Sequence, residues 1–302
     1  MRFYRPLGHV LARIPLRPDG SIRLTALLAG TGVFARKQLR RAKPWVDGER
    51  MKSSDALSFG PNEVRTVALG PYEFTVREDD QLTLAVHKPA DVVTSANPEE
   101  GFRVIDLLPD WLFSDYLEPI GRLDKETTGL LLLSEDGQLS QRMRHPARAQ
   151  LRRYEATLAR PLEPQRVQEA LNKGISLRDG HVVQPRELQA IRDDNLRWKV
   201  AIDEGKYHEV RRLFAAMGSH VESLHRYGYG PFILQSAPVD PYDDTEDGIA
   251  CCTTLASETT PPSIVLHDGL MRIEGAAKTH LYTTLQLQPH TRMIEITVDE
   301  HA

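Results

Sequence analysis

The pattern of apolar and polar positions predicts an α+β protein. Short apolar or alternating runs are typical of strands, whereas apolar residues spaced three and four apart are typical of helices. Strands are predicted at residues 82–87, 129–133, 154–158 and 197–202, and helices at residues 24–28, 35–41, 103–108 and 164–171. Because the two kinds of element interleave without a strict strand–helix–strand repeat, we predict a mixed sheet rather than a doubly wound one.

The most regular helical pattern lies just before Gly218. Val210, Leu213, Phe214 and Met217 recur at the spacing that places apolar side chains on one helix face. A glycine directly after such a pattern is a common helix stop. We therefore predict a helix that ends at Gly218 and packs one face into the core.

Length and local composition suggest how the chain is divided. At roughly 150 residues per domain, two units are expected. Residues 1–20 contain three prolines and no periodicity, and are predicted to be an irregular basic extension. Residues 240–302 begin with an acidic linker and continue as short strand-like runs. They predict a β-rich appendage whose role the sequence does not indicate.

The charge is unevenly distributed. The net charge of −4 disfavours a nucleic-acid partner, but residues 1–52 carry +9 and residues 241–302 carry −7. A basic end on a nearly neutral body is typical of a module that docks on a polyanion.

Metal, disulfide and nucleotide chemistry are not indicated. The only cysteines, Cys251 and Cys252, are adjacent, and the 11 histidines show no ligand spacing. A phosphate-binding loop that ends in Gly-Lys-Ser/Thr is missing. No stretch has the roughly 20 apolar residues of a membrane span, and the start lacks the apolar segment of a secretory signal. We expect a cytoplasmic protein without a metal, a nucleotide cofactor or a membrane partner.

Residues 121–134 bring charged side chains to the start of a core strand. Arg122, Asp124, Lys125 and Glu126 crowd the loop before the apolar run at residues 129–133. Taken alone, a satisfied ion pair in a loop is the more common explanation, since structural ion pairs outnumber catalytic ones.

Four segments in order resemble the pseudouridine synthases that modify ribosomal RNA and carry an N-terminal S-four domain. They are residues 121–134, Lys88-Pro89 with residues 92–95, Arg152-Arg153-Tyr154, and residues 204–218. Thr127-Thr128-Gly129 and residues 224–226 are most similar to the small-subunit enzymes. The resemblance implies the pseudouridine synthase fold, with a mainly antiparallel sheet, over residues 78–239. It also implies no cofactor, because the conversion of uridine to pseudouridine is redox-neutral.

The resemblance implies roles for single residues. Asp124 matches the catalytic aspartate, which would act as a nucleophile or as a general base. Tyr154 would stack on the extruded uracil, with an ordinary core tyrosine as the alternative. Arg211, or its neighbour Arg212, would pair with Asp124 and keep it ionised. The other substrate contacts are expected from Arg122, which resembles the intercalating residue of the family, and from Arg212, Lys88, Leu224, Arg152 and Arg153.

The basic segment resembles the S-four RNA-binding domain, here expected at residues 21–69. Its basic helix contains no acid, which favours phosphate contacts over a merely solvated face. The expected RNA-docking residues are Arg23, Arg36, Lys37, Arg40 and Arg41. A second acid-free run contains five arginines, at positions 142, 144, 148, 152 and 153, and is expected to line the entrance of the catalytic cleft.

The expected partner is small-subunit ribosomal RNA or a ribosomal assembly intermediate, bound by a monomer. One alternative is an enzyme for large-subunit RNA. Another is a non-catalytic RNA-binding or ribosome-assembly factor, because Asp91, Glu209 and Gly228 depart from the family pattern.

Overall fold

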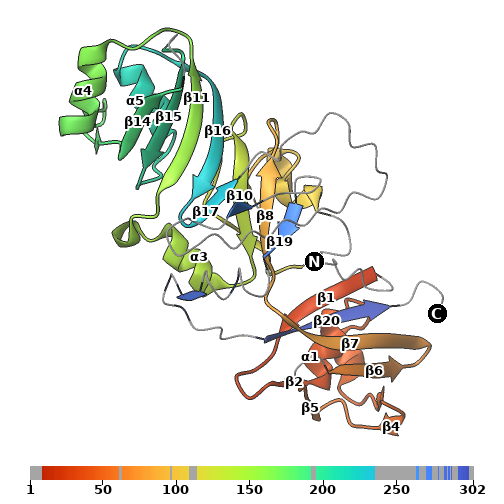
Figure 1. Cartoon of the computed structure of the whole chain (residues 1–302). Coiled ribbons are helices and arrows are strands. Elements are labelled where there is room, and N and C mark those ends of the chain that lie inside the picture. The colour runs from red at the N-terminus through yellow and green to blue at the C-terminus, as the bar shows by residue number, and fades with distance from the viewer. Residues whose placement is uncertain are drawn as a thin grey trace, which may run out of the picture.

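The chain folds around two large sheets, one at each end of the view in Figure 1. The computed structural model describes residues 9–60, 63–95, 97–108, 114–191, 195–234, 263–264, 270–273, 278, 282–283, 285, 287 and 292–298. Cys251 and Cys252 lie outside the described residues. Among the described helices, none is long and apolar enough to cross a membrane.

The first sheet has six strands in the order β1-β20-β7-β6-β3-β4. Its strands are β1 (His9–Pro15), β3 (Trp45–Val46), β4 (Glu49–Arg50), β6 (Val64–Leu69), β7 (Tyr72–Asp80) and β20 (Arg292–Val298). The short helices α1 (Leu24–Gly30) and α2 (Arg36–Leu39) and the strand pair β2 (Ser21–Arg23) and β5 (Ala56–Ser58) complete this unit. Buried apolar side chains from α1, including Leu24, Leu27 and Leu28, form one core with Phe74 and Ile296 of the sheet.

The second sheet has ten strands, with the main order β14-β15-β11-β16-β10-β8-β19. These strands are β8 (Thr83–Lys88), β10 (Thr128–Ser134), β11 (Arg152–Leu158), β14 (Glu187–Ala190), β15 (Arg197–Ile202), β16 (Val221–Tyr229) and β19 (Leu270–Arg272). Three more strands join off this path: β9 (Glu118–Ile120), β17 (Phe232–Leu234) and β18 (Ser263–Ile264). Along the main order the neighbouring strands pair antiparallel except β10 and β16, which run parallel. This is the predicted α+β architecture with a mixed, mainly antiparallel sheet.

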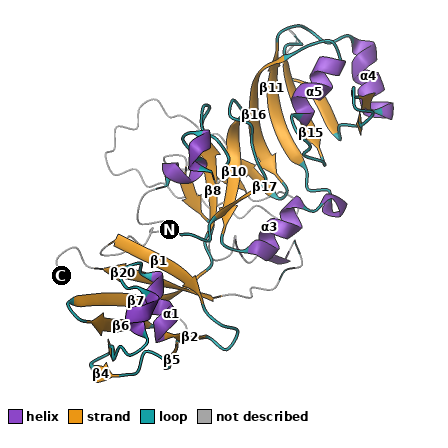
Figure 2. Cartoon of the chain, turned by 180° about the vertical axis from the view of Figure 1, so that it is seen from behind, coloured by secondary structure: helices purple, strands orange, loops and turns teal. Residues whose placement is uncertain are grey.

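Helices cover both faces of the second sheet (Figure 2). On one face lie α4 (Pro164–Lys173) and α5 (Glu209–Ala216), with the hairpin of β12 (Ile175–Ser176) and β13 (Val182–Val183) between them in the chain. On the other face α3 (Gly137–Arg144) packs through Leu139 and Met143. Three short 3-10 helices complete the described elements: Pro98–Glu100, Val104–Leu107 and Pro146–Arg148. The helix predicted at residues 103–108 is therefore a single 3-10 turn.

The predicted irregular extension at residues 1–20 is wrong for its second half. Residues His9–Pro15 form strand β1, which pairs antiparallel with β20 from the other end of the chain. The strand was hidden because its partner lies about 280 residues away, and because Pro15 falls at its end rather than inside it.

The predicted C-terminal appendage is not a separate unit. Strand β20 lies between β1 and β7 in the first sheet, as Figure 1 shows, whereas β19 pairs with β8 at the edge of the second. Tyr282 is buried and donates a hydrogen bond from its hydroxyl to Asp136, the residue that caps α3. The C-terminal region therefore completes both sheets.

Candidate active site

Asp124 lies in the loop between β9 and β10, and backbone contacts fix this loop on three sides. The amide of Thr127 donates to the carbonyl of Asp124 at 3.0 Å, which closes a tight turn. The hydroxyl of Thr94 donates to the carbonyl of Leu123 at 3.1 Å. The ammonium of Lys88 donates to the carbonyl of Lys125 at 3.0 Å. The loop therefore presents the Asp124 side chain from a fixed backbone.

Lys88 is a structural residue here, and its predicted substrate contact is wrong. Its side chain is fully buried, and its Nζ also donates to the carbonyls of Pro89 at 2.7 Å and Val92 at 2.8 Å. An ammonium has three N–H donors, so these contacts use all of them. Burial lowers the pKa of Lys88 to about 8, although nearby carboxylates, chiefly Glu126, favour the charged form.

Gly129 permits the close approach of the two parallel strands behind the loop. Its φ is +105°, and a Cβ atom there would lie 2.3 Å from the carbonyl oxygen of Arg226 on β16. Any side chain would force β10 and β16 apart. The glycine thus sets the position at which Asp124 enters the site.

Helix α5 brings two basic side chains to Asp124. His208 precedes the helix with a left-handed backbone, φ +50°, and its Nε2 lies 3.4 Å from the Oδ1 of Asp124. Arg211, the third residue of the helix, places its Nε 3.8 Å from the Oδ2 of Asp124. It is held in place by a 3.1 Å hydrogen bond from its Nη1 to the carbonyl of Val221. Histidine is one of the non-glycine residues that adopt this left-handed conformation more often than most.

The two candidate arginines of α5 have different partners. Arg211 faces Asp124 as predicted, whereas the Nη2 of Arg212 lies 2.5 Å from the Oδ2 of Asp179. Arg212 therefore fastens α5 to the β12–β13 hairpin, and neither the predicted pairing with Asp124 nor the predicted substrate contact is borne out by its geometry.

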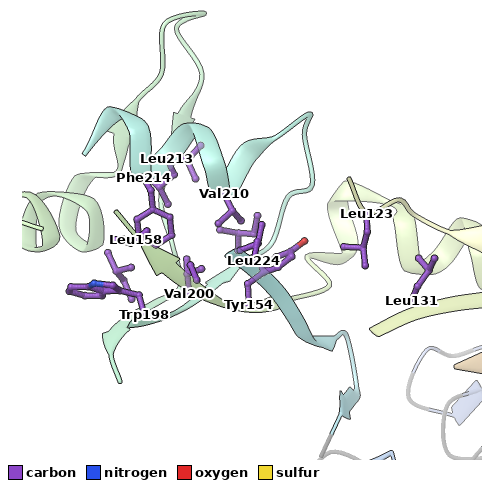
Figure 3. Packing of buried hydrophobic residues seen from close by; sticks show 14 of the residues in the cluster. Leu123, Leu131, Tyr154, Leu158, Trp198, Val200, Val210, Leu213, Phe214 and Leu224 are labelled. Carbon is purple, nitrogen blue, oxygen red and sulfur yellow. The ribbon is translucent and has the colours of Figure 1, made fainter. Parts of the chain in front are cut away.

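Tyr154 forms part of the wall between the cleft and the core. It lies on β11, is only 7% exposed, and packs with Leu224 and Val210. Figure 3 shows its hydroxyl directed toward the loop that carries Leu123, while α5 packs over the neighbouring apolar side chains. Its ring is thus both a core residue and a lining residue, so the two alternatives raised by the sequence are compatible.

A cleft joins these elements. Its lining includes six of the residues predicted for the site, namely Arg122, Asp124, Arg152, Tyr154, Arg211 and Leu224. Arg122 is exposed at the rim, whereas Arg152 donates from its Nη1 to the carbonyls of Gln150 at 3.1 Å and Asp203 at 2.9 Å.

Most of the acid-free arginine run lies away from the cleft. Of its five arginines, all within the described part of the chain, only Arg152 is part of the lining. Arg153 donates instead to the carbonyl of Gly230 at 3.1 Å, because alternate residues of a strand face opposite sides of the sheet. Arg153 therefore does not line this cleft, and its substrate contact stays a prediction.

His208 and Arg226 are among the residues of the cleft that were not predicted for the site. His208 could have been suspected from its place in the Lys206–Arg212 segment, three residues before Arg211. Arg226 also lines the cleft, yet it is 1% exposed and its Nε donates to the carbonyl of Leu130 at 2.8 Å. Only the three-dimensional pairing of β16 with β11, which sets Arg226 opposite Tyr154, reveals its position.

One group of metal-ligand types lies beside the cleft. His181, Glu204 and Glu209 have ligand atoms within 4.8 Å of one another. The ammonium of Lys206 lies 2.9 Å from both Glu204 Oε2 and His181 Nδ1. This ammonium supplies positive charge to the cluster, so we interpret the cluster as an ion-pair network rather than as a metal site.

The basic residues of the N-terminal unit surround a second cavity. Arg23, Arg36 and Arg40 line it together with Arg17, and Lys37 and Arg41 are exposed outside the lining. Asp115 and Tyr116, which precede β9, form part of its wall.

Known proteins resemble this chain over the same elements. Residues 82–216 match the family described as RNA pseudouridylate synthase. Ribosomal small subunit pseudouridine synthase A of Vibrio parahaemolyticus is 34% identical over 218 residues, which cover 72% of this chain and 90% of that protein. Ribosomal large subunit pseudouridine synthase B of Yersinia pestis is 30% identical over 221 residues, which cover 70% and 68%. A crystal structure of a pseudouridylate synthase aligns at 30% identity with a TM-score of 0.46, covering 69% of this chain and 89% of that one.

The fold and the match define an isomerase. The chain belongs to the RNA pseudouridine synthase family.

Proposed function

We propose that the protein converts a uridine of small-subunit ribosomal RNA to pseudouridine, with Asp124 as the catalytic carboxylate. The observation that carries the proposal is the position of Asp124, whose two oxygens lie 3.4 Å from His208 and 3.8 Å from Arg211 in a cleft. Several relatives named as small-subunit enzymes support the choice of RNA.

The reaction breaks the bond between N1 of uracil and C1′ of ribose and forms a bond between C5 and C1′. The proton on C5 is lost and N1 gains one, so the change is an isomerisation. The Arg211 guanidinium lies 3.8 Å from Asp124, which acts at the sugar–base bond as a nucleophile or as a general base.

The base must leave its stack before it can reach Asp124. Tyr154 offers the extruded uracil a ring face in the cleft, and its hydroxyl is directed toward the Asp124 loop. Arg122, exposed at the rim, would occupy the space that the uridine leaves in the RNA.

The N-terminal unit is proposed to dock RNA. Its five predicted contacts are all exposed and lie on or next to the two short helices: Arg23, Arg36, Lys37, Arg40 and Arg41. Phosphate contacts of this kind give affinity without reading sequence.

Modification of separated ribosomal RNAs by the purified protein tests the proposal. Pseudouridine is expected in small-subunit RNA, at one position. Product in large-subunit RNA alone would favour the alternative that the Yersinia pestis relative suggests. No product in either RNA, with RNA binding intact, would favour a non-catalytic binding factor.

A further inference from the structure

The ring of Tyr207 is exposed beside the catalytic carboxylate and has no role in the reaction described above. It is 78% exposed, the highest value among the exposed large apolar side chains of the described chain. It lies between two residues that line the cleft, Lys206 and His208. Single exposed aromatic rings are common on protein surfaces. What distinguishes this one is its place in the chain between two residues that line the cleft containing Asp124.

One face of the ring is already stacked. The rings of Tyr207 and His208 are parallel, with centroids 3.9 Å apart and planes 15° apart. His208 in turn lies 3.4 Å from Asp124 through its Nε2. The His208 ring therefore lies next to the Asp124 carboxylate, and the Tyr207 ring stacks on His208. The other face of the Tyr207 ring is open to solvent.

Hydrogen bonds restrain the backbone of the segment that carries the two rings. The Nη1 of Arg212 donates to the carbonyl of Tyr207 at 3.5 Å, and the backbone amide of Lys206 donates to Glu209 Oε2 at 3.0 Å. Glu209 is buried, and its other oxygen lies 2.9 Å from His181 Nε2. These contacts also explain why a carboxylate at position 209 is compatible with RNA binding, because both of its oxygens are bound by groups of the protein itself.

We propose that the Tyr207–His208 ring pair is a stacking platform for an unpaired nucleobase adjacent in the RNA to the uridine that enters the cleft. An aromatic face that is already formed binds a base with little loss of conformational entropy. Stacking accepts any base, so the platform contributes affinity rather than sequence selection. The proposal rests on the function proposed above.

Steady-state kinetics on an RNA stem-loop that contains the target uridine test the platform. The Tyr207→Ala variant is expected to raise KM about tenfold, in the range of one lost stacked base, with kcat within about twofold of the unmodified protein. Tyr207→Phe retains the ring and should match the unmodified protein. Tyr207→Leu retains apolar volume without a flat ring and should behave like Tyr207→Ala.

An abasic nucleotide in the RNA identifies the occupant. When the base next to the target uridine is removed, on the side that stacks, the unmodified protein and Tyr207→Ala should have the same KM. Equal KM values for the two proteins on intact RNA would overturn the platform. It would also be overturned if Tyr207→Ala still raised KM on both abasic RNAs, one lacking the base on the 5′ side of the target and the other lacking the base on its 3′ side.

The two proposals fail in different ways. If the unmodified protein makes no pseudouridine, the proposed function fails, and the platform is then tested by binding alone. The probe is the fluorescence of 2-aminopurine in a short single-stranded RNA, which stacking quenches. Quenching that Tyr207→Ala abolishes would support the platform, and equal quenching by both proteins would contradict it.

Discussion

The guanidinium of Arg13, on the first strand, donates from its Nε to Oε1 of Glu135 at 2.8 Å, where Glu135 directly follows strand β10 of the other sheet. Its Nη1 contacts Glu295 at 2.8 Å and Asp79 at 2.9 Å, so the arginine gathers carboxylates from β20, β7 and the end of β10. The Arg13 side chain is 1% exposed. Burial alone would lower its pKa, but the carboxylate of Glu135 and the two others hold that pKa above its ordinary value. The contact joins the first sheet to the end of the strand that follows the Asp124 loop.

Replacement of Arg13 is expected to destabilise the protein strongly. Arg13→Met leaves buried carboxylates without a cation, which costs about 3–5 kcal/mol. The matched control is Arg65→Met on β6, whose ion pairs with Asp47 and Glu63 are partly exposed and should contribute at most about 1 kcal/mol. Urea unfolding measures both. Equal losses in the free energy of unfolding for the two variants would show that the buried network stabilises the protein no more than a surface ion pair does.

Strand β20 is expected to be essential for the N-terminal unit. Ile296 on this strand is fully buried, and its truncation in Ile296→Ala should cost about 2–5 kcal/mol through lost burial and a cavity. Val64→Ala, on the same sheet but 56% exposed, should change stability by less than about 0.5 kcal/mol. Thermal unfolding distinguishes them. A mild effect at position 296 would mean that the C-terminal strand is dispensable.

The pH dependence of stability should report on Lys88. In the native protein this lysine releases its proton near pH 8, against 10.5 for an ordinary lysine. Between pH 8 and pH 10.5 the unfolded chain binds more protons than the native protein does. The free energy of unfolding therefore rises with pH in this window, by up to about 3 kcal/mol. Lys88→Met should remove this rise. Parallel stability curves for the two proteins across this pH window would contradict the assignment.

Loss of Arg211 should slow the reaction more than it weakens binding. Arg211→Met removes the cation 3.8 Å from Asp124 and should lower kcat by about 100-fold or more, the scale of losing one electrostatic group in an active site. Arg166→Met on α4, where the arginine pairs with Glu169 on the surface, is the control and should leave kcat unchanged. The idea fails if Arg211→Met raises only KM.

The core elements of the catalytic sheet could be predicted from local sequence because each carries its own signal. The run at residues 129–133 is strand β10, and the spacing from Val210 to Met217 is helix α5 with Gly218 after it. Tyr154, Asp124 and Arg211 meet in one cleft as the motifs implied.

What could not be predicted depends on contacts between distant segments. Strand β1 needs β20, and the choice between Arg211 and Arg212 depends on Asp179, in a hairpin whose position the sequence does not encode locally. The same limit explains why Lys88 was assigned a substrate contact. The sequence shows that the residue is charged, but not that three backbone carbonyls accept its hydrogen bonds.

The most direct test of the account is pseudouridine formation by Asp124→Asn, compared with the unmodified protein on the same ribosomal RNA. The amide keeps the shape of the carboxylate but can neither attack the sugar nor take a proton. The account predicts that RNA binding and the unfolding curve are retained while no pseudouridine forms. Pseudouridine formed by Asp124→Asn at the rate of the unmodified protein would contradict it.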